Sequence, residues 1–377
     1  MGCGQRALED MVNMLQKLTE VYKGKKVFLT GHTGFKGSWL LKIFSLLGAE
    51  VKGYALAPQN ELNLYSVISG DASCQSVIAD LRNREALNEA VASFQPDFIF
   101  HLAAQPLVRL SYEIPSETFE VNAIGTANVL DAMAKLNKPC NAVLITTDKV
   151  YHNNEWAYPY RETDRLGGYD PYSASKACTE LVIDSYRNSF FNTKAYDKHQ
   201  KAIAVGRAGN VIGGGDWSKD RLIPDIARAL SAGKDIEVRN PASVRPWQHV
   251  LEPLLGYLLL GAKLAESPQA YSQAYNFGPD VNDAFPVKRM VELAIECWGS
   301  GSYYTNVDPN QPHEAGLLKL DISKAIDELK WKPLFNATKA VQYTIDWYKV
   351  FYTDKDEAAA YTEEQILAFL NSTDDGQ

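Results

Sequence analysis

Tyr172 and Lys176 are four residues apart in the segment Tyr-Ser-Ala-Ser-Lys, a spacing that places both side chains on one face of a helix. A phenol with a pKa of about 10 is a weak base at neutral pH, but a neighbouring ammonium favours the phenolate. The pair is therefore suited to taking a proton from an alcohol. The spacing alone is weak evidence, because the sequence contains 20 tyrosines and repeats the spacing at Tyr22 and Lys26.

Three further polar residues, Thr147, Asp148 and Lys149, come directly after an apolar run at 142–146 that we expect to form a strand. Side chains that follow parallel strands meet at one edge of a sheet, and ligands bind there. This placement favours Tyr172 with Lys176 as the functional pair, because Tyr172 follows that strand, whereas Tyr22 and Lys26 precede the first strand. We expect Thr147 to orient the alcohol from which Tyr172 takes the proton.

A glycine-rich turn follows the first apolar run, 27–30, and leads into a helical pattern at 35–47. Strand, glycine turn and helix in this order are typical of a dinucleotide site, because glycine lets the backbone approach a pyrophosphate at the helix N-terminus. The alternative is a tight turn without a ligand. The residues that we expect to contact the dinucleotide in this turn are Gly31, Thr33, Gly34, Phe35, Lys36 and Gly37.

The second apolar run, 51–56, ends without the acidic residue that usually contacts the adenosine ribose of NAD. Residues 54–58 offer neither a carboxylate nor an arginine, so this rule leaves NAD and NADP open. After the next run, 77–79, Asp80 and Leu81 are placed to border the adenine. Asp80 is nearly as well explained as a solvated helix cap.

Strand-like and helix-like patterns alternate through the first half of the chain. Parallel strands need crossover connections, so the alternation predicts an α/β fold with a doubly wound parallel sheet of the Rossmann type. After about residue 207 the alternation weakens, which predicts a smaller C-terminal substrate-binding lobe. The expected strands are 27–30, 51–56, 77–79, 98–102, 142–146 and 202–205, and the expected helices are 35–47, 84–93, 118–135 and 172–190.

The same pattern predicts the division of the chain. We expect residues 25–206 to form the dinucleotide-binding domain and 207–352 mainly the substrate-binding lobe, with about 245–275 returning to the first domain. Residues 1–24 are predicted to be an N-terminal helical extension, and the acid-rich residues 353–377 a surface helix with a frayed end. The apolar positions of the N-terminal helix are Leu8, Met11, Leu15, Leu18 and Tyr22.

Composition excludes several classes of protein. The 377 residues carry a formal charge of −8, and 46% of them are hydrophobic, which fits a globular chain without a main nucleic-acid or anionic membrane partner. The five cysteines include no CxxC pair and the histidines show no ligand spacing, so we expect neither disulfides nor a metal site. Without an apolar run long enough to span a membrane or a secretory core at the start, we expect a cytoplasmic protein.

Together, several motifs resemble the extended short-chain dehydrogenase/reductase family over about residues 25–352, and within it the chain is most similar to the CDP-glucose 4,6-dehydratases. The resemblance implies NAD as a recycled cofactor and a homodimer formed through helices 118–135 and 171–190. The family motifs are GxxGFxG, His101-Leu-Ala-Ala104, Asn122, Thr147 and Tyr172 with Lys176; those of the branch are Thr147-Asp148-Lys149, residues 206–217 and Arg245-Pro-Trp-Gln-His249; the further cofactor contacts are Leu102, Ala103, Ala104 and Gln105.

The resemblance also implies a redox-neutral dehydration of CDP-glucose to a 4-keto-6-deoxy sugar nucleotide. Tyr172 takes the C4 hydroxyl proton while hydride passes to NAD, Asp148 protonates the departing C6 hydroxyl, and hydride returns to C6. Asp148 must then be protonated, so we expect burial to raise its pKa. Related dehydratases often have a glutamate as the C5 base where this chain has Lys149. Either neutral Lys149 is the base, or its cation stabilises the enolate.

For the nucleotide, the resemblance implies residues of the second lobe. An arginine side chain binds phosphate through two parallel hydrogen bonds. Each of these charges is equally well explained as a surface or interdomain group. The expected substrate residues are Arg207, Asn210, Arg221, Arg245, His313 and Glu314.

Three alternatives stay open. The chain can be another 4,6-dehydratase, acting on dTDP-glucose or GDP-mannose, because the sequence does not reveal the base contacts. A nucleotide-sugar 4-epimerase shares Thr147 and Tyr172 but needs no acid at Asp148. A dinucleotide-sensing module without catalysis typically lacks the tyrosine or the lysine, and both are present here.

Overall fold

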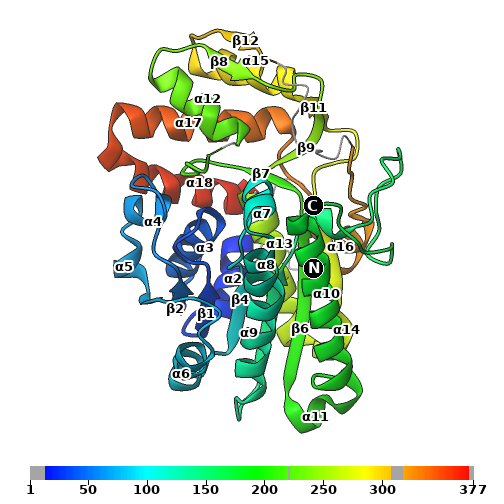
Figure 1. Ribbon diagram of the computed structural model, residues 1–377. Helices are drawn as coiled ribbons and strands as arrows, with labels where there is room; N and C mark the ends of the chain where they lie inside the picture. Colours follow the sequence, from blue (N-terminus) through cyan, green and yellow to red (C-terminus); the bar gives the residue numbers. More distant parts are fainter. Residues whose placement is uncertain (1–12, 220, 307–316, 373–377) are drawn as a thin grey trace, which may run out of the picture.

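The computed structural model describes residues 13–219, 221–306 and 317–372 (Figure 1). At its centre lies a seven-stranded sheet in which all neighbouring strands are parallel. The order β3-β2-β1-β4-β5-β6-β10 changes direction between β1 and β4, which opens a crevice at their carboxyl ends. The predicted doubly wound α/β fold is confirmed. The strands are β1 (Lys26–Thr30), β2 (Glu50–Ala55), β3 (Gln75–Ile78), β4 (Phe98–His101), β5 (Cys140–Ile145), β6 (Lys201–Ala208) and β10 (Ala274–Phe277).

Helices cover both faces of this sheet (Figure 1). Successive side chains of a strand point to opposite faces, so Val27 and Leu29 of β1 pack in one core and Phe28 in the other. The apolar runs of the central strands therefore correspond to burial on both faces, whereas β3 at the edge of the sheet is only partly buried. The helices of the first face are α3 (Phe35–Leu46) and α13 (Leu251–Glu266), and those of the second are α6 (Arg84–Phe94), α9 (Gly125–Ala134) and α10 (Pro171–Ser189).

The helix predicted at 118–135 is interrupted. It consists of α8 (Pro115–Phe119), a π-helical turn η1 (Glu120–Ile124) and then α9. The π turn carries Asn122, whose side-chain amide donates to Ser175 Oγ of α10 at 2.8 Å and to the Gln105 carbonyl at 3.1 Å. Such a turn re-aims one side chain within a helix, and here it joins α10 to the loop after β4.

The C-terminal lobe consists of short strands and of helices above the carboxyl edge of the large sheet (Figure 1). One small sheet has the order β11-β9-β7, with β7 parallel and β11 antiparallel to β9, and β12 pairs with β8 in another. The elements of the C-terminal lobe are β7 (Asn210–Ile212), α12 (Leu222–Ser231), β8 (Ile236–Val238), β9 (Val244–His249), β11 (Ala284–Pro286), α15 (Val287–Trp298), β12 (Tyr303–Thr305) and α17 (Ala337–Thr353).

Both ends of the described chain pack on the body of the protein. The helix α2 (Met14–Tyr22) buries Met14, Leu18 and Tyr22, while Leu8 and Met11 lie outside the described residues. The helix α18 (Ala358–Ser372) packs against α17 and α2. It buries Ile366, Phe369 and Leu370, so it is more than the surface helix predicted for this end: its apolar face belongs to the main core.

The remaining elements are short connections. They are α4 (Leu64–Val67), α5 (Gly70–Ser73), α7 (Val108–Glu113), α11 (Tyr196–His199), α14 (Pro268–Tyr271), α16 (Ser323–Leu329), η2 (Asp148–Val150), η3 (Thr193–Ala195) and η4 (Lys355–Glu357).

No helix in the described parts of the chain combines the length and the apolar character needed to cross a lipid bilayer.

Candidate active site

The turn between β1 and α3 brings three glycines into close backbone contact. Gly31 has a φ of +77°, and a Cβ atom there would lie 2.8 Å from the Ala103 amide nitrogen, so this position requires glycine. A Cβ at Gly37 would lie 2.0 Å from the Gly31 carbonyl oxygen. Gly34 is the N-cap of α3 and provides no side-chain hydrogen bond to the first amides of the helix. The turn thus has the shape and the uncapped helix end that a pyrophosphate site needs.

Two histidines of these motifs are buried structural groups. His32 Nε2 lies 2.8 Å from Ser76 Oγ, and burial lowers the pKa of His32 to about 4. His101 lies between Thr30 Oγ1, at 2.7 Å, and Thr126 Oγ1, at 3.0 Å, and burial lowers its pKa to about 3. Both imidazoles are neutral at neutral pH. They support the backbone around the turn and carry no charge into the crevice.

The loop after β4 lies against the glycine turn. The amides of Leu102 and Ala103 both donate to Thr30 Oγ1, each at 3.1 Å. Gln105 is held by its own side chain, which donates to Thr118 Oγ1 at 3.0 Å and accepts from the Leu107 amide at 2.6 Å. The predicted cofactor residues of this loop are therefore fixed next to Gly31.

Asp80 lies beyond β3, where the adenine was expected. Its carboxylate accepts from Arg82, with 2.6 Å between Nη2 and Oδ2, and this hydrogen bond holds the pKa of Asp80 below its usual range. The N-cap of α6 is Asn83, so the explanation of Asp80 as that cap is wrong. Leu81 is buried beside it, and the Tyr54 hydroxyl of β2 donates to the Asp80 carbonyl at 2.9 Å.

The carboxyl end of β5 turns directly into the predicted catalytic residues. Thr147 is the N-cap of η2, and its Oγ1 donates to Asp148 Oδ1 at 2.9 Å. Both side chains are buried. Burial raises the pKa of Asp148, and the nearby charges of Lys149 and Arg245 only oppose this effect. The direction is the one expected for a carboxyl group that donates a proton.

The C-terminal lobe closes around this carboxyl group. A Cβ atom at Gly209, between β6 and β7, would lie 2.9 Å from Asp148 Oδ2, so no side chain fits there without moving the acid. Gly209 also lines a cavity with Pro246 and Leu320, between the sheet and the lobe. Asp148 therefore lies where sheet and lobe meet.

Tyr172 occupies the first turn of α10, which begins at Pro171 after the N-cap Asp170. The phenol is close enough to the Thr147 side chain and to the Asp148 carboxyl group for both to affect its pKa. Burial raises the pKa of Tyr172 to about 12, because it outweighs the opposing effects of Thr147 and of the Arg221 charge. The expected lowering of this pKa depends on the cation of a bound cofactor as well as on Lys176, and the charges of the described residues alone do not offset the burial of the phenol.

Lys176 lies one turn further along α10. Its Nζ donates to the Ile145 carbonyl at the end of β5, at 3.0 Å. Burial lowers the pKa of Lys176 to about 8, and the carboxylate of Glu180 opposes this effect. The ammonium is therefore held at the strand end that leads into Thr147.

Two further cations approach from other elements. Arg221 is the N-cap residue of α12, and its Nη1 lies 2.9 Å from Asp216 Oδ2. Lys36, in the glycine turn, has a pKa lowered to about 8 by burial, by Arg221 and by Lys176, while Asp148 raises it. Lys36 therefore faces the acid as well as the cofactor turn.

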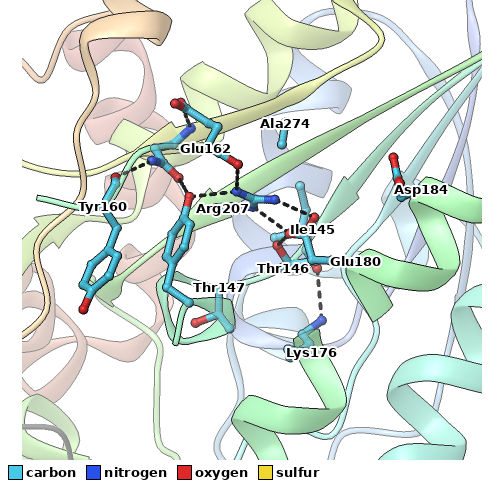
Figure 2. A network of polar contacts seen from close by, with 12 residues as sticks. Ile145, Thr146, Thr147, Tyr160, Glu162, Lys176, Glu180, Asp184, Arg207 and Ala274 are labelled. Atoms are coloured by element: carbon cyan, nitrogen blue, oxygen red, sulfur yellow. Dashed lines mark hydrogen bonds and ion pairs between the residues drawn. The ribbon is translucent and has the colours of Figure 1, made fainter. Parts of the chain in front are cut away.

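Arg207 departs from the prediction. It lies on β6, is only 4% exposed and forms an internal ion pair (Figure 2). Its Nε and Nη2 donate to the two carboxylate oxygens of Glu180 at 2.8 and 2.9 Å, and Nη1 donates to the Tyr151 hydroxyl and the Glu162 carbonyl. With four hydrogen bonds inside the protein, this guanidinium is not available to a phosphate, and we do not retain it as a substrate residue.

The other expected substrate residues have different positions. Asn210 begins β7 and is half-buried opposite Trp247. Arg245 lies on β9, close enough to Asp148 to lower its pKa. His313 and Glu314 lie outside the described residues. In the part of the chain that the structure describes, no group of three His, Cys, Asp or Glu side chains could hold a metal ion.

Residues 28–344 match the family described as GDP-mannose 4,6 dehydratase. The chain belongs to this family. A CDP-glucose 4,6-dehydratase of Salmonella typhimurium is 46% identical over 352 residues, which cover 93% of this chain and 98% of the relative. A CDP-paratose 2-epimerase of Salmonella typhi is 25% identical over 341 residues, 85% of this chain and 98% of the relative.

Solved structures of this dehydratase family's fold superimpose on the chain. The dTDP-glucose 4,6-dehydratase of Streptomyces venezuelae, solved with NAD, has a TM-score of 0.73 at 22% identity and covers 86% of this chain and 97% of its own. The UDP-glucose 4-epimerase of Thermotoga maritima has a TM-score of 0.73 at 18% identity, with 86% and 98% covered. At these identities the two structures show the shared fold.

Sequence reasoning missed two acidic residues next to the site. Glu180 forms an ion pair with Arg207. It lies four residues after Lys176, and this spacing indicates that the two side chains share one face of the helix. Asp216 holds Arg221 and precedes it by five residues in an irregular segment, where spacing predicts no contact.

Proposed function

We propose that this chain catalyses the NAD-dependent dehydration of CDP-glucose to CDP-4-keto-6-deoxyglucose. The observation that carries the proposal is the Thr147-Asp148 turn, where a buried acid with a raised pKa lies beside the phenol of Tyr172. A 4-epimerase needs the phenol but no such acid. The identity of 46% to the Salmonella typhimurium CDP-glucose 4,6-dehydratase supports CDP-glucose over other nucleotide sugars.

The residues of the β1–α3 turn fit a pyridine dinucleotide. The backbone of Gly31, Gly34 and Gly37 would hold the pyrophosphate at the uncapped N-terminus of α3, in a turn too tight for a Cβ at Gly31 or Gly37. The chemistry that bound NAD would supply is hydride transfer, as the acceptor at C4 of the sugar and then as the donor at C6. We choose NAD over NADP because the dTDP-glucose 4,6-dehydratase of Streptomyces venezuelae was solved with NAD.

The chain's own groups move the protons. Tyr172 takes the proton of the C4 hydroxyl, which the neighbouring Thr147 orients. Arg221, and Lys176 one helical turn further along α10, favour the phenolate, but the pKa of Tyr172 is about 12 in their presence. The cation of bound NAD would supply the further positive charge that the phenol needs to act near neutral pH. Protonated Asp148 then gives its proton to the departing C6 oxygen, and water leaves.

Removal of the C5 proton falls to Lys149 in this proposal. The residue is half-buried directly after Asp148, and its charge lowers the pKa of that acid. A neutral amine at this position accepts the C5 proton once the C4 ketone has formed. The alternative, a Lys149 cation that stabilises the enolate, predicts that Lys149→Arg retains dehydration, whereas loss of dehydration in that variant supports the base.

The experiment that tests the proposed function compares substrates. The protein and NAD are incubated with CDP-glucose, dTDP-glucose, GDP-mannose or UDP-glucose, then treated with alkali, and the ultraviolet absorbance of a 4-keto-6-deoxy product is recorded, with Tyr172→Phe as the inactive control. We expect absorbance with CDP-glucose. Absorbance only with dTDP-glucose or GDP-mannose would replace the substrate. Conversion of UDP-glucose to its C4 epimer without absorbance would replace the reaction, and NAD binding without any turnover would indicate a sensing module.

We also propose that two copies associate through α10 and the α8–η1–α9 helix. On these packed helices Ile124 and Leu181 are 55% and 62% exposed although both are large and apolar. Exposed apolar side chains on neighbouring helices favour a twofold interface. Light scattering should give the mass of two chains, and Leu181→Lys should give one. A wild-type chain that is monomeric at working concentration would contradict this assembly.

A further inference from the structure

Two side chains of α10 hold consecutive residues at the end of β5. Lys176 and Glu180 lie one helical turn apart, on one face. Lys176 Nζ donates to the Ile145 carbonyl at 3.0 Å, and Thr146 Oγ1 donates to Glu180 Oε1 at 2.6 Å (Figure 2). The next residue is Thr147. The helix that carries the phenol is therefore locked in register with the strand end that carries the acid.

Arg207 fixes Glu180 from the neighbouring strand. Ile145 of β5 is opposite Gly206 of β6, so Arg207 comes from the position next to the strand end. Its two hydrogen bonds to Glu180 are parallel, both side chains are 5% exposed, and the guanidinium stacks on the Tyr151 ring at 5.1 Å. Because a buried ion pair is often no more stable than apolar side chains of the same volume, stability alone does not explain charges at this place.

We propose that Glu180 is a positioning residue: its carboxylate keeps the Lys176 ammonium charged and holds the strand end that precedes Thr147. The inference rests on the proposed function, because it assigns the charged lysine to the same reaction. It adds a residue that touches neither sugar nor cofactor.

The charges around Lys176 come from several elements. Glu180 favours the ammonium and raises its pKa. Lys36 of the glycine turn is a like charge, and the charge of Lys176 lowers the pKa of Lys36. His101 of β4 is neutral at neutral pH, because burial lowers its pKa to about 3. The charged groups that face Glu180 itself are Arg187 and Arg207.

Two matched variants separate charge from anchoring. Glu180→Gln keeps the size of the side chain and an acceptor for Thr146, and removes the charge. Thr146→Val removes the hydroxyl and keeps the charge. The titration of Lys176 is followed by NMR in protein labelled with ¹³C at the lysine Cε, with the resonance assigned through Lys176→Arg. We expect the midpoint to fall by about one pH unit in Glu180→Gln and to stay in place in Thr146→Val.

Activity with CDP-glucose gives the second measurement. In Glu180→Gln the alkaline limb of the kcat profile should move to lower pH, Glu180→Asp should restore it, and Thr146→Val should lower kcat without moving the limb. If Glu180→Gln does not fold, the double variant Glu180→Gln/Arg207→Gln, which removes both members of the ion pair, is titrated and compared with Arg207→Gln alone, so that the two differ only in the charge of residue 180. An unchanged Lys176 midpoint overturns the inference. A wild-type chain that leaves CDP-glucose unchanged overturns the proposed function, while the NMR titration still decides the role of Glu180.

Discussion

The two sides of the crevice differ in the groups that form the ligand site. At the β1–α3 turn the backbone itself makes the site, and Cβ atoms at Gly31 and Gly37 would lie 2.8 and 2.0 Å from other backbone atoms. At the end of β5 the site consists of buried side chains, and burial shifts the pKa values of Asp148, Tyr172 and Lys176. Substitutions in the first region should therefore act by exclusion of volume, and those in the second by charge.

The largest effect is expected at the turn. In Gly37→Ala the new Cβ would lie 2.0 Å from the Gly31 carbonyl oxygen, so the backbone must move. We expect NAD affinity, measured by calorimetry, to fall by about 100-fold or more. Gly278→Ala is the control, because its Cβ would make ordinary contacts, the nearest at 3.5 Å. Equal affinities in both variants would show that the turn does not hold the dinucleotide.

Next in size is the removal of a buried charge. Arg207→Met leaves the Glu180 carboxylate buried without its partner, so urea denaturation should show a loss of about 3–5 kcal/mol in the free energy of unfolding. The KM for CDP-glucose should change little. Arg221→Met, at a residue still assigned to substrate, should raise KM with a smaller loss of stability. The reverse pattern in the two variants would return Arg207 to the substrate site.

A smaller effect is expected when volume is added next to the buried side chains at the end of β5. Gly209→Ala places a Cβ 2.9 Å from Asp148 Oδ2 and should displace the acid. We expect dehydration to slow by about 10- to 100-fold, while NAD affinity stays at the wild-type value. Stopped-flow absorbance and calorimetry measure the two quantities. Unimpaired dehydration would mean that the position of Asp148 is not critical.

The smallest effect is expected at a carboxyl group outside the site whose pKa is also shifted by burial. Glu252 of α13 is buried, accepts from the amides of Leu334 and Phe335 at 2.9 and 2.7 Å, and has a pKa raised by burial to about 8. The folded state therefore keeps a proton that the unfolded state loses near pH 4, so stability falls by about 1.4 kcal/mol per pH unit between pH 5 and 7. Glu252→Gln should remove this contribution. A slope identical to that of the wild type would contradict the raised pKa.

Features set by neighbouring residues were predictable. Six of the seven strands of the large sheet lie at the expected runs, and the strand–turn–helix order located the glycine turn. The edge strand β10 was not expected. Thr147, Asp148 and Tyr172 were predicted to lie together because Thr147 and Asp148 follow the strand end and Tyr172 begins a later helix. The family resemblance supplied the reaction, and the raised pKa of Asp148 has the predicted direction.

Features set by distant residues were not predictable. The partner of Arg207 is 27 residues away, on a helix whose packing on β6 no local pattern reveals. The π-helical turn at Asn122 depends on contacts with Ser175 and Gln105 from two other segments. The raised pKa of Tyr172 depends on how deeply α10 is buried, which periodicity does not measure.

The central claim is that Asp148 acts after the phenol, as the acid of water elimination. Rapid-quench analysis of Asp148→Asn with CDP-glucose and NAD tests it directly. Oxidation at C4 should continue, so that the 4-keto sugar nucleotide with its C6 hydroxyl accumulates, while the 4-keto-6-deoxy product should form about 100-fold or more slowly. Formation of that product at the wild-type rate would show that Asp148 is not the acid of water elimination.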